Sequence, residues 1–232
     1  MKKFISLIII ICMLIIPLCS NAAATETGSI QESDYSTTIV QMGDISVEVP
    51  VYTQRVLVAN NEDHIALTRM IHIPQNTEEC LANNSKIVSE IKTYGAPTTR
   101  GTMNFGDYGY MTFTSTLNYG YRYNQGFRYI KMISYKIERE IYTSAPYNTF
   151  GKPQVRVVQV GETFEDGYDS ADLLSQYYDQ TMNFDTLYTV PSDWAYVYQV
   201  GPTNGLHYRI QIDYATSFGA TDYTLEFSHP AI

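Results

Sequence analysis

YGYRYNQGFRYIKMISYKIEREIY, residues 119–142, is the stretch that decides the predicted fold. Aromatic and aliphatic side chains alternate with polar ones along both of its halves, which is the period-two pattern of β-strands. Asn124, Gln125 and Gly126 stand between the halves and are typical of a tight turn. The stretch therefore predicts a hairpin of two antiparallel strands.

The length of this turn decides which side chains share a face. A two-residue loop would place Tyr123 opposite Arg128, whereas a three-residue loop would place Tyr123 opposite Phe127. The three-residue loop keeps the rings together, and its third position suits a glycine in the left-handed conformation. We therefore predict the three-residue turn. The expected aromatic face comprises Tyr121, Tyr123, Phe127 and Tyr129, and continues into Ile133, Tyr135 and Ile137.

The aromatic face has two interpretations. Its continuation into Ile133 and Ile137 favours a core face, because paired rings stabilise a sheet without any ligand. An exposed platform on which a ligand stacks is the alternative. On the opposite face Arg122 would lie across from Arg128, an arrangement that favours an acidic neighbour or an anionic ligand. The candidate ligand-binding residues are Tyr121, Tyr123, Phe127, Tyr129, Arg122 and Arg128.

Short segments of alternating polarity recur along the rest of the chain, joined by glycine-bearing loops. They occupy residues 45–51, 54–59, 64–73, 110–117, 154–160, 194–200, 206–214 and 222–228. Pro50 marks the first as an edge strand or as its end. The predicted fold class is all-β and mainly antiparallel, arranged as a two-sheet β-sandwich or jelly roll. We expect one domain over residues 36–232, with a division into two lobes near 144–153 as the alternative.

Two stretches have helical signals and would be short insertions. In residues 76–84, Asn76 or Thr77 can cap a helix whose first turn carries glutamates. In residues 169–180, Ser170 can cap, and the leucines at 173 and 174 meet the tyrosines at 177 and 178 at a spacing of four. We therefore predict a short helix in each.

The first 24 residues have a three-part layout of Lys2 and Lys3, an apolar run over 4–18, and small residues over 20–24. This layout resembles the bacterial export signals. The resemblance implies cleavage after Ala24 and a secreted, extracellular protein without membrane association after cleavage. The apolar run is too short to favour a permanent span, although an uncleaved anchor and lipidation at Cys19 are alternatives. Polar residues 25–35 are expected to form a flexible leader.

The amino-acid composition limits the classes of partner that the chain can bind. The net charge of −9 becomes more negative when Lys2 and Lys3 are removed, and no basic cluster remains, which excludes nucleic acid and anionic membranes. Cleavage would leave Cys80 as the single thiol, so no internal disulfide can form. Cys80 is then a small buried hydrophobe or a reactive thiol. The 21 tyrosines suit binding surfaces as well as a core.

Two groups of carboxylates could carry chemistry. Glu138 and Glu140 share a strand face about 7 Å apart, a separation that paired catalytic carboxylates of a glycoside hydrolase can have. Calcium is the one cofactor that the sequence suggests, in an acidic loop at Glu165, Asp166, Asp169 and Asp172. The four histidines have no metal-ligand spacing, and no nucleophile or nucleotide motif is present.

These observations predict a secreted, non-catalytic binding or adhesion module that recognises an extracellular glycan or protein. A secreted glycoside hydrolase using Glu138 and Glu140 is one alternative. A toxin-like or envelope-structural protein is another. The sequence does not determine the oligomeric state or the ligand.

Overall fold

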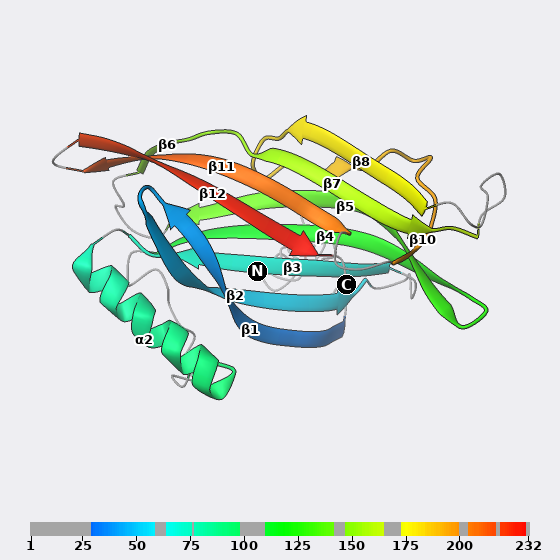
Figure 1. The fold of residues 1–232 in the computed structure, drawn as a ribbon, viewed down its shortest axis with the longest axis horizontal. Coiled ribbons are helices and arrows are strands. Elements are labelled where there is room, and N and C mark those ends of the chain that lie inside the picture. The colour runs from blue at the N-terminus through cyan, green and yellow to red at the C-terminus, as the bar shows by residue number, and fades with distance from the viewer. Residues whose placement is uncertain are drawn as a thin grey trace, which may run out of the picture.

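A computed structural model describes residues 29–58, 64–75, 77–97, 110–141, 147–164, 173–199, 204–216 and 219–230 (Figure 1). The mostly antiparallel β architecture predicted from the alternating pattern is confirmed. The strands are β1 (Ser29–Met42), β2 (Ile45–Leu57), β3 (His64–Ile73), β4 (Met111–Asn124), β5 (Phe127–Ile141), β6 (Tyr147–Phe150), β7 (Gln154–Glu162), β8 (Leu173–Thr181), β9 (Tyr188–Thr189), β10 (Val197–Gln199), β11 (Gly205–Thr216) and β12 (Gly219–Pro230), and the helix is α2 (Glu78–Tyr94).

Hydrogen bonding joins the described strands into one sheet, in the order β1-β2-β3-β4-β5-β10-β7-β11-β12. The first five strands are neighbours in chain order, and β10 then connects β5 to β7. Three further strands lie off this path, because β6 pairs with β11, β8 with β7, and β9 with β5. This hydrogen bonding therefore describes one sheet rather than the two separate sheets of a sandwich.

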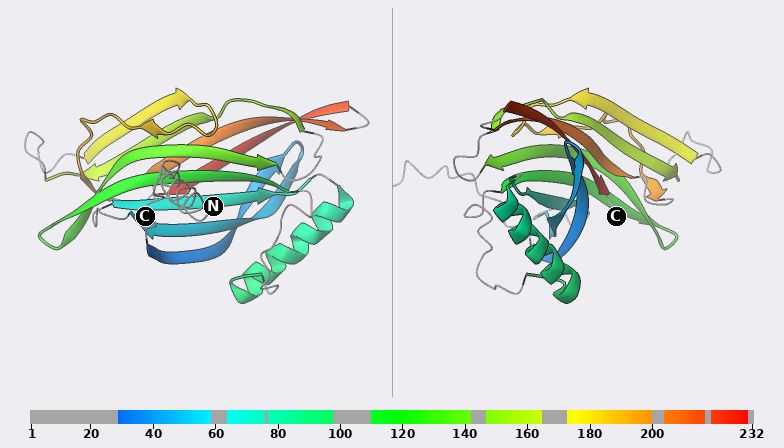
Figure 2. Two further views of the ribbon diagram at one scale, coloured as in Figure 1. Left: turned by 180° about the vertical axis from the view of Figure 1, so that it is seen from behind. Right: turned by 60° about the vertical axis from the view of Figure 1, so that its left-hand side comes forward.

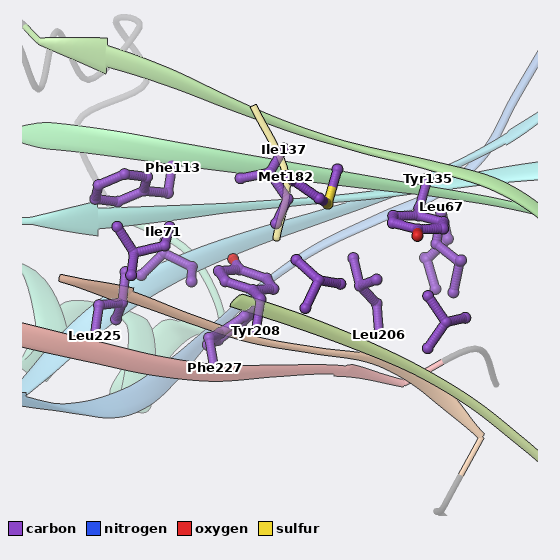
Figure 3. Packing of buried hydrophobic residues seen from close by; sticks show 14 of the residues in the cluster. Leu67, Ile71, Phe113, Tyr135, Ile137, Met182, Leu206, Tyr208, Leu225 and Phe227 are labelled. Atoms are coloured by element: carbon purple, nitrogen blue, oxygen red, sulfur yellow. The ribbon is translucent and has the colours of Figure 1, made fainter. Parts of the chain in front are cut away.

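The hydrophobic core lies between two halves of the sheet, one containing β3 and β4 and the other containing β11 and β12. Figure 3 shows Leu67 and Phe113, on β3 and β4, pointing toward Leu206 and Leu225, on β11 and β12. Along β4 the inward residues Phe113, Ser115 and Leu117 are fully buried, and the threonines between them face outward, as the alternation predicts. Burial of one such apolar side chain contributes roughly 1.5–3 kcal/mol.

The helix α2 lies against β1 and β2 (Figures 1 and 2). Its Thr77 cap is confirmed, since the Thr77 hydroxyl accepts a hydrogen bond from the Cys80 amide at 3.3 Å. The helix ends at Gly95 rather than near residue 84, because Ile87 and Ile91 continue its apolar face against Tyr110. Among the described residues, no helix has both the length and the apolar character needed to cross a bilayer.

The second predicted helix, over residues 169–180, is wrong where the structure describes it. Residues 173–181 form β8, which pairs with β7 along its whole length. Contacts of inward-facing side chains explain why this stretch forms a strand. Gln176 accepts a hydrogen bond from the buried Gln159 at 2.9 Å, and Gln180 donates to the Tyr135 hydroxyl. Tertiary pairing thus outweighs a local spacing that also suits a helix.

Candidate functional site

The β4–β5 hairpin turns at Gln125 and Gly126 alone. Tyr123 pairs with Arg128 and Asn124 with Phe127, so the three-residue turn predicted from the sequence is wrong. Both turn residues have positive φ, 51° at Gln125 and 86° at Gly126, which is the type I′ geometry. This geometry matches the twist of the strands. A bulge between Asn118 and Tyr119 shifts the register farther along the hairpin.

The two-residue turn distributes the rings over both faces of the hairpin. Tyr121 and Tyr123 share a face with Arg128, while Phe127 and Tyr129 share the other face with Arg122. The single aromatic face is therefore a wrong prediction, and so is the facing pair of arginines. Tyr123 is 67 % exposed and Phe127 is 53 % exposed, so these two rings do not serve the core.

Four rings gather on one face of this hairpin into what we call the hairpin cluster: Phe127, Tyr129, Phe164 and Tyr198. Their ring centroids lie 4.6 Å apart for Tyr129 and Phe164, and 5.4 Å apart for Phe127 and Tyr198. On the same face, the Arg122 guanidinium lies 4.2 Å above the Tyr196 ring. Sequence reasoning missed Phe164 and the tyrosines of residues 196 and 198, because only the pairing of β10 with β5 on one side and with β7 on the other brings them here.

The turn gives a direct stability prediction. Gln125→Asn should raise the free energy of unfolding by roughly 0.5–1 kcal/mol, because asparagine adopts the left-handed conformation more readily than glutamine. Urea unfolding monitored by circular dichroism measures the change. Gln154→Asn, on a strand, is the control and should give no stabilisation, since asparagine is a poor strand former. Equal effects at both positions would contradict the prediction.

Glu138 and Glu140 lie on one face of β5, opposite Thr114 and Thr112. Glu138 forms an ion pair with Lys136 on the same strand. The predicted calcium ligands Glu165, Asp166, Asp169 and Asp172 lie outside the described residues. Within the part of the chain that the structure describes, no three metal-ligating side chains of His, Cys, Asp or Glu come together.

A set of polar side chains from β3, β4 and β12 spans the core. The Ser115 hydroxyl and His229 Nδ1 lie 2.9 Å apart, and both residues are fully buried. Arg69 reaches across from β3, where its Nη1 donates to the Ser228 carbonyl at 2.8 Å and its guanidinium lies 4.8 Å above the Phe227 ring. Although a serine beside a histidine can form a nucleophile, this pair is closed off from solvent. Its contacts join the two halves of the sheet.

A hollow lies on the outer face of β8, β7, β11 and β12, and we call it the outer hollow. Its volume is about 920 Å³. The strand register sets two rows of side chains across these four strands. One row is Asp179, Arg156, His207 and Ser228; the next is Thr181, Gln154, Arg209 and Glu226.

Paired charges hold the floor of the outer hollow in place. Arg156 binds Asp179 through two parallel contacts, Nε to Oδ1 and Nη2 to Oδ2, both 2.6 Å long. The hydrogen bond with Arg156 lowers the pKa of the Asp179 carboxyl, and the same bond raises the pKa of Arg156. Arg209 Nε lies 3.2 Å from Glu226 Oε1 in the neighbouring row. The Arg156–Asp179 pair therefore stays ionised near neutral pH.

An exposed ring stands at the edge of the outer hollow. Tyr177 is 65 % exposed, and the Arg156 guanidinium lies 5.7 Å from its centroid. Its cross-strand neighbours are Val158 and then Gly205, whose lack of a side chain leaves this row low. None of these residues was a candidate from the sequence, where they are scattered over 154–228 and follow no motif.

A second, smaller hollow of about 500 Å³ lies between the start of β2 and α2. Lys92 Nζ lies 2.6 Å from Glu48 Oε2 there, and Asn84 donates to the Glu48 carbonyl at 2.7 Å. The Lys92 side chain is 57 % exposed, equal to that of Arg156. The two hollows thus offer matched positions for mutagenesis.

Comparison with protein families, with curated proteins and with solved structures finds no match for this chain.

Proposed function

We propose that this chain is a secreted, non-catalytic binding module that recognises an extracellular glycan in the outer hollow. The observation that carries the proposal is the double row of side chains across four strands, with Arg156–Asp179 and Arg209–Glu226 held by their own ion pairs. Side chains that already hold one another in place lose little conformational entropy when a ligand binds.

The chemistry of the outer hollow suits a neutral, hydroxyl-rich ligand. Each sugar hydroxyl both donates and accepts, and the rows offer guanidinium donors, carboxylate acceptors, and the amide of Gln154, which does both. Because two arginines face one aspartate and one glutamate, the formal charges of these pairs cancel. A strongly charged ligand would therefore gain little net attraction, whereas a neutral glycan needs none. The exposed Tyr177 ring offers an apolar surface for the C–H face of a sugar.

The hairpin cluster supports a second candidate function, which is binding of a protein partner. Figure 1 shows the end of the β4–β5 hairpin projecting beyond the neighbouring strands, which suits contact with a large partner. Two exposed rings lie near the end of this hairpin, Phe127 of the cluster on one face and Tyr123 on the opposite face. Aromatic side chains beside arginine are enriched in protein interfaces. The fold proposed for both candidates is sandwich-like, because two halves of one sheet face each other across the core.

A glycan array followed by titration calorimetry tests the proposed function. Arg156→Ala should weaken binding of the best oligosaccharide about tenfold or more, since a hydrogen bond to a charged group contributes roughly 1.5–3 kcal/mol. The fold should persist, because an exposed ion pair contributes about 1 kcal/mol or less to stability.

Lys92→Ala is the matched control, because it removes an equally exposed cation from the smaller hollow. It should leave the affinity within about twofold of wild type. Loss of binding in Lys92→Ala with none in Arg156→Ala would move the site to the smaller hollow. Absence of binding to every glycan on the array would reject the glycan proposal and favour a protein partner.

A further inference from the structure

The strand β8 is an edge of the sheet. It is hydrogen-bonded to β7 from Leu173 to Thr181, and no other described strand pairs with it. In Figures 1 and 2 it lies at the margin of the molecule. By contrast, the strands at the two ends of the hydrogen-bonding order, β1 and β12, contact each other. Among the remaining described strands that pair on one side only, β8 is longer than β6 and β9, so its outer edge offers the longest row of backbone groups to another strand.

Nothing in the sequence of β8 protects this edge. Soluble proteins block edge strands with lysines, prolines or bulges. The strand LLSQYYDQT contains no lysine, arginine or proline, and its register with β7 runs without a bulge. Its single charge, Asp179, is neutralised by Arg156. Leu173 and Tyr177 are both exposed large apolar side chains.

We propose that two copies of this chain associate through antiparallel pairing of β8 with its counterpart, centred on Tyr177. In this register all nine residues find partners, and the two Tyr177 rings meet at the two-fold axis. Asp179 of each copy lies opposite Ser175 of the other, so the carboxylates do not face each other. Tyr178 lies opposite Gln176, and Leu173 opposite Thr181.

A second copy fits this edge because the strand is complementary to itself. A two-fold interface places the same surface on both sides, so every contact occurs twice. Cross-strand aromatic pairs are among the favourable pairs of an antiparallel sheet. The chain carries a net charge of −9, which opposes association, but the charge on β8 is locally paired. Salt should therefore favour the dimer by screening the remaining repulsion.

The pairing has a consequence that rests on the proposed function. The outer faces of the two copies would form one continuous surface of eight strands, with an outer hollow on each side of the axis. A polymeric glycan could then contact both hollows, and the second contact would be intramolecular. The dimer itself does not depend on what the hollows bind.

Sedimentation velocity on the ligand-free chain tests the dimer. Wild type should be dimeric at concentrations of about 10–100 µM, whereas Tyr177→Lys and Tyr177→Glu should each be monomeric, because each sets like charges together at the axis. An equimolar mixture of the two variants should restore the dimer through a lysine–glutamate pair. Tyr123→Lys is the control at an equally exposed tyrosine of the hairpin and should stay dimeric.

A wild-type chain that is monomeric at about 100 µM would overturn the proposal. A dimer in Tyr177→Lys, or no dimer in the mixture, would do so as well. Circular dichroism checks that each variant is folded, and the mixture separates a local charge effect from misfolding. The glycan test is distinguishable, because Arg156→Ala is evaluated by the affinity for the oligosaccharide and this experiment by mass alone.

Discussion

The free energy of unfolding should fall by about 4 kcal/mol between pH 7.5 and pH 5.0. Burial lowers the pKa of His72 and of His229 to about 3, from an ordinary value of 6.5, and the nearby Arg69 charge adds to the effect at His229. At pH 5.0 each histidine lies about 1.5 pH units below its unfolded pKa, which corresponds to about 2 kcal/mol per group.

The sign of this dependence follows from where the protons bind. In the folded protein both imidazoles stay neutral down to about pH 3, since burial in the core disfavours the charged form. In the unfolded chain both bind a proton below pH 6.5. The unfolded state therefore holds more protons between pH 6.5 and about 3, and acid favours it. The contribution of the two neutral histidines to the free energy of unfolding is complete above pH 6.5. It is lost progressively as the pH falls through this window.

Urea unfolding at the two pH values measures the loss, with the fluorescence of the buried Trp194 as the signal. His72→Asn should reduce the loss by about 2 kcal/mol, because asparagine can keep the contact that His72 Nδ1 makes with Thr112 Oγ1 at 2.9 Å without titrating. His229→Asn should act alike through Ser115.

Carboxylates are the competing source of acid sensitivity. The pKa of Glu48 is lowered by its hydrogen bonds with Lys92 and Thr37, and that of Asp179 by its hydrogen bond with Arg156. Such groups lose their contribution only as the pH falls through carboxyl pKa values, which is below the window tested. An undiminished loss at pH 5.0 in the double histidine variant would therefore contradict the assignment to His72 and His229.

The features that the sequence predicts correctly are those set by near neighbours in the chain. Alternation placed Phe113 and Leu117 inward along β4, and the hydroxyl of Thr77 caps α2 as expected. The expectation that Pro50 makes its strand an edge or ends it is wrong, because β2 continues to Leu57 between β1 and β3, but the pairing of β2 with β3 begins only at Val51. At the proline the strand is thus paired on one side only, which its missing amide requires.

The errors arise where a distant strand decides between local options. The stretch 173–181 suits a helix by spacing, but the contact of Gln180 with Tyr135 belongs to a strand. The hairpin turn was chosen to keep the rings on one face, whereas the type I′ geometry at Gln125 and Gly126 distributes them.

The outer hollow was beyond the sequence altogether. Arg156 meets Asp179 across β7 and β8, and His207 across β7 and β11, so the site exists only once three registers are set. None of these residues stands in a local motif. A register slip by one residue would exchange the outward row for the buried one, which local patterns cannot exclude.

Gly161→Ala should lower the free energy of unfolding by about 3 kcal/mol or more, because the new methyl group has no space. A Cβ at residue 161 would lie 1.9 Å from the Tyr198 carbonyl oxygen and 3.2 Å from the Val197 Cβ. The obstacle is backbone rather than a flexible side chain, so β10 itself must move. Since β10 pairs with both β5 and β7, its displacement weakens the link between the two halves of the sheet and withdraws the buried Val197.

Gly126→Ala separates this crowding from the general cost of replacing a glycine. A Cβ at residue 126 meets no atom within 4 Å, so that variant loses only the left-handed conformation of its backbone, at φ 86°. Its cost should be about 1–2 kcal/mol. Urea unfolding compares the two, and hydrogen exchange should show faster exchange at residues 197–199 in Gly161→Ala alone. Equal destabilisation of the two variants, with unchanged exchange at β10, would mean that the approach of β10 to β7 does not hold the sheet together.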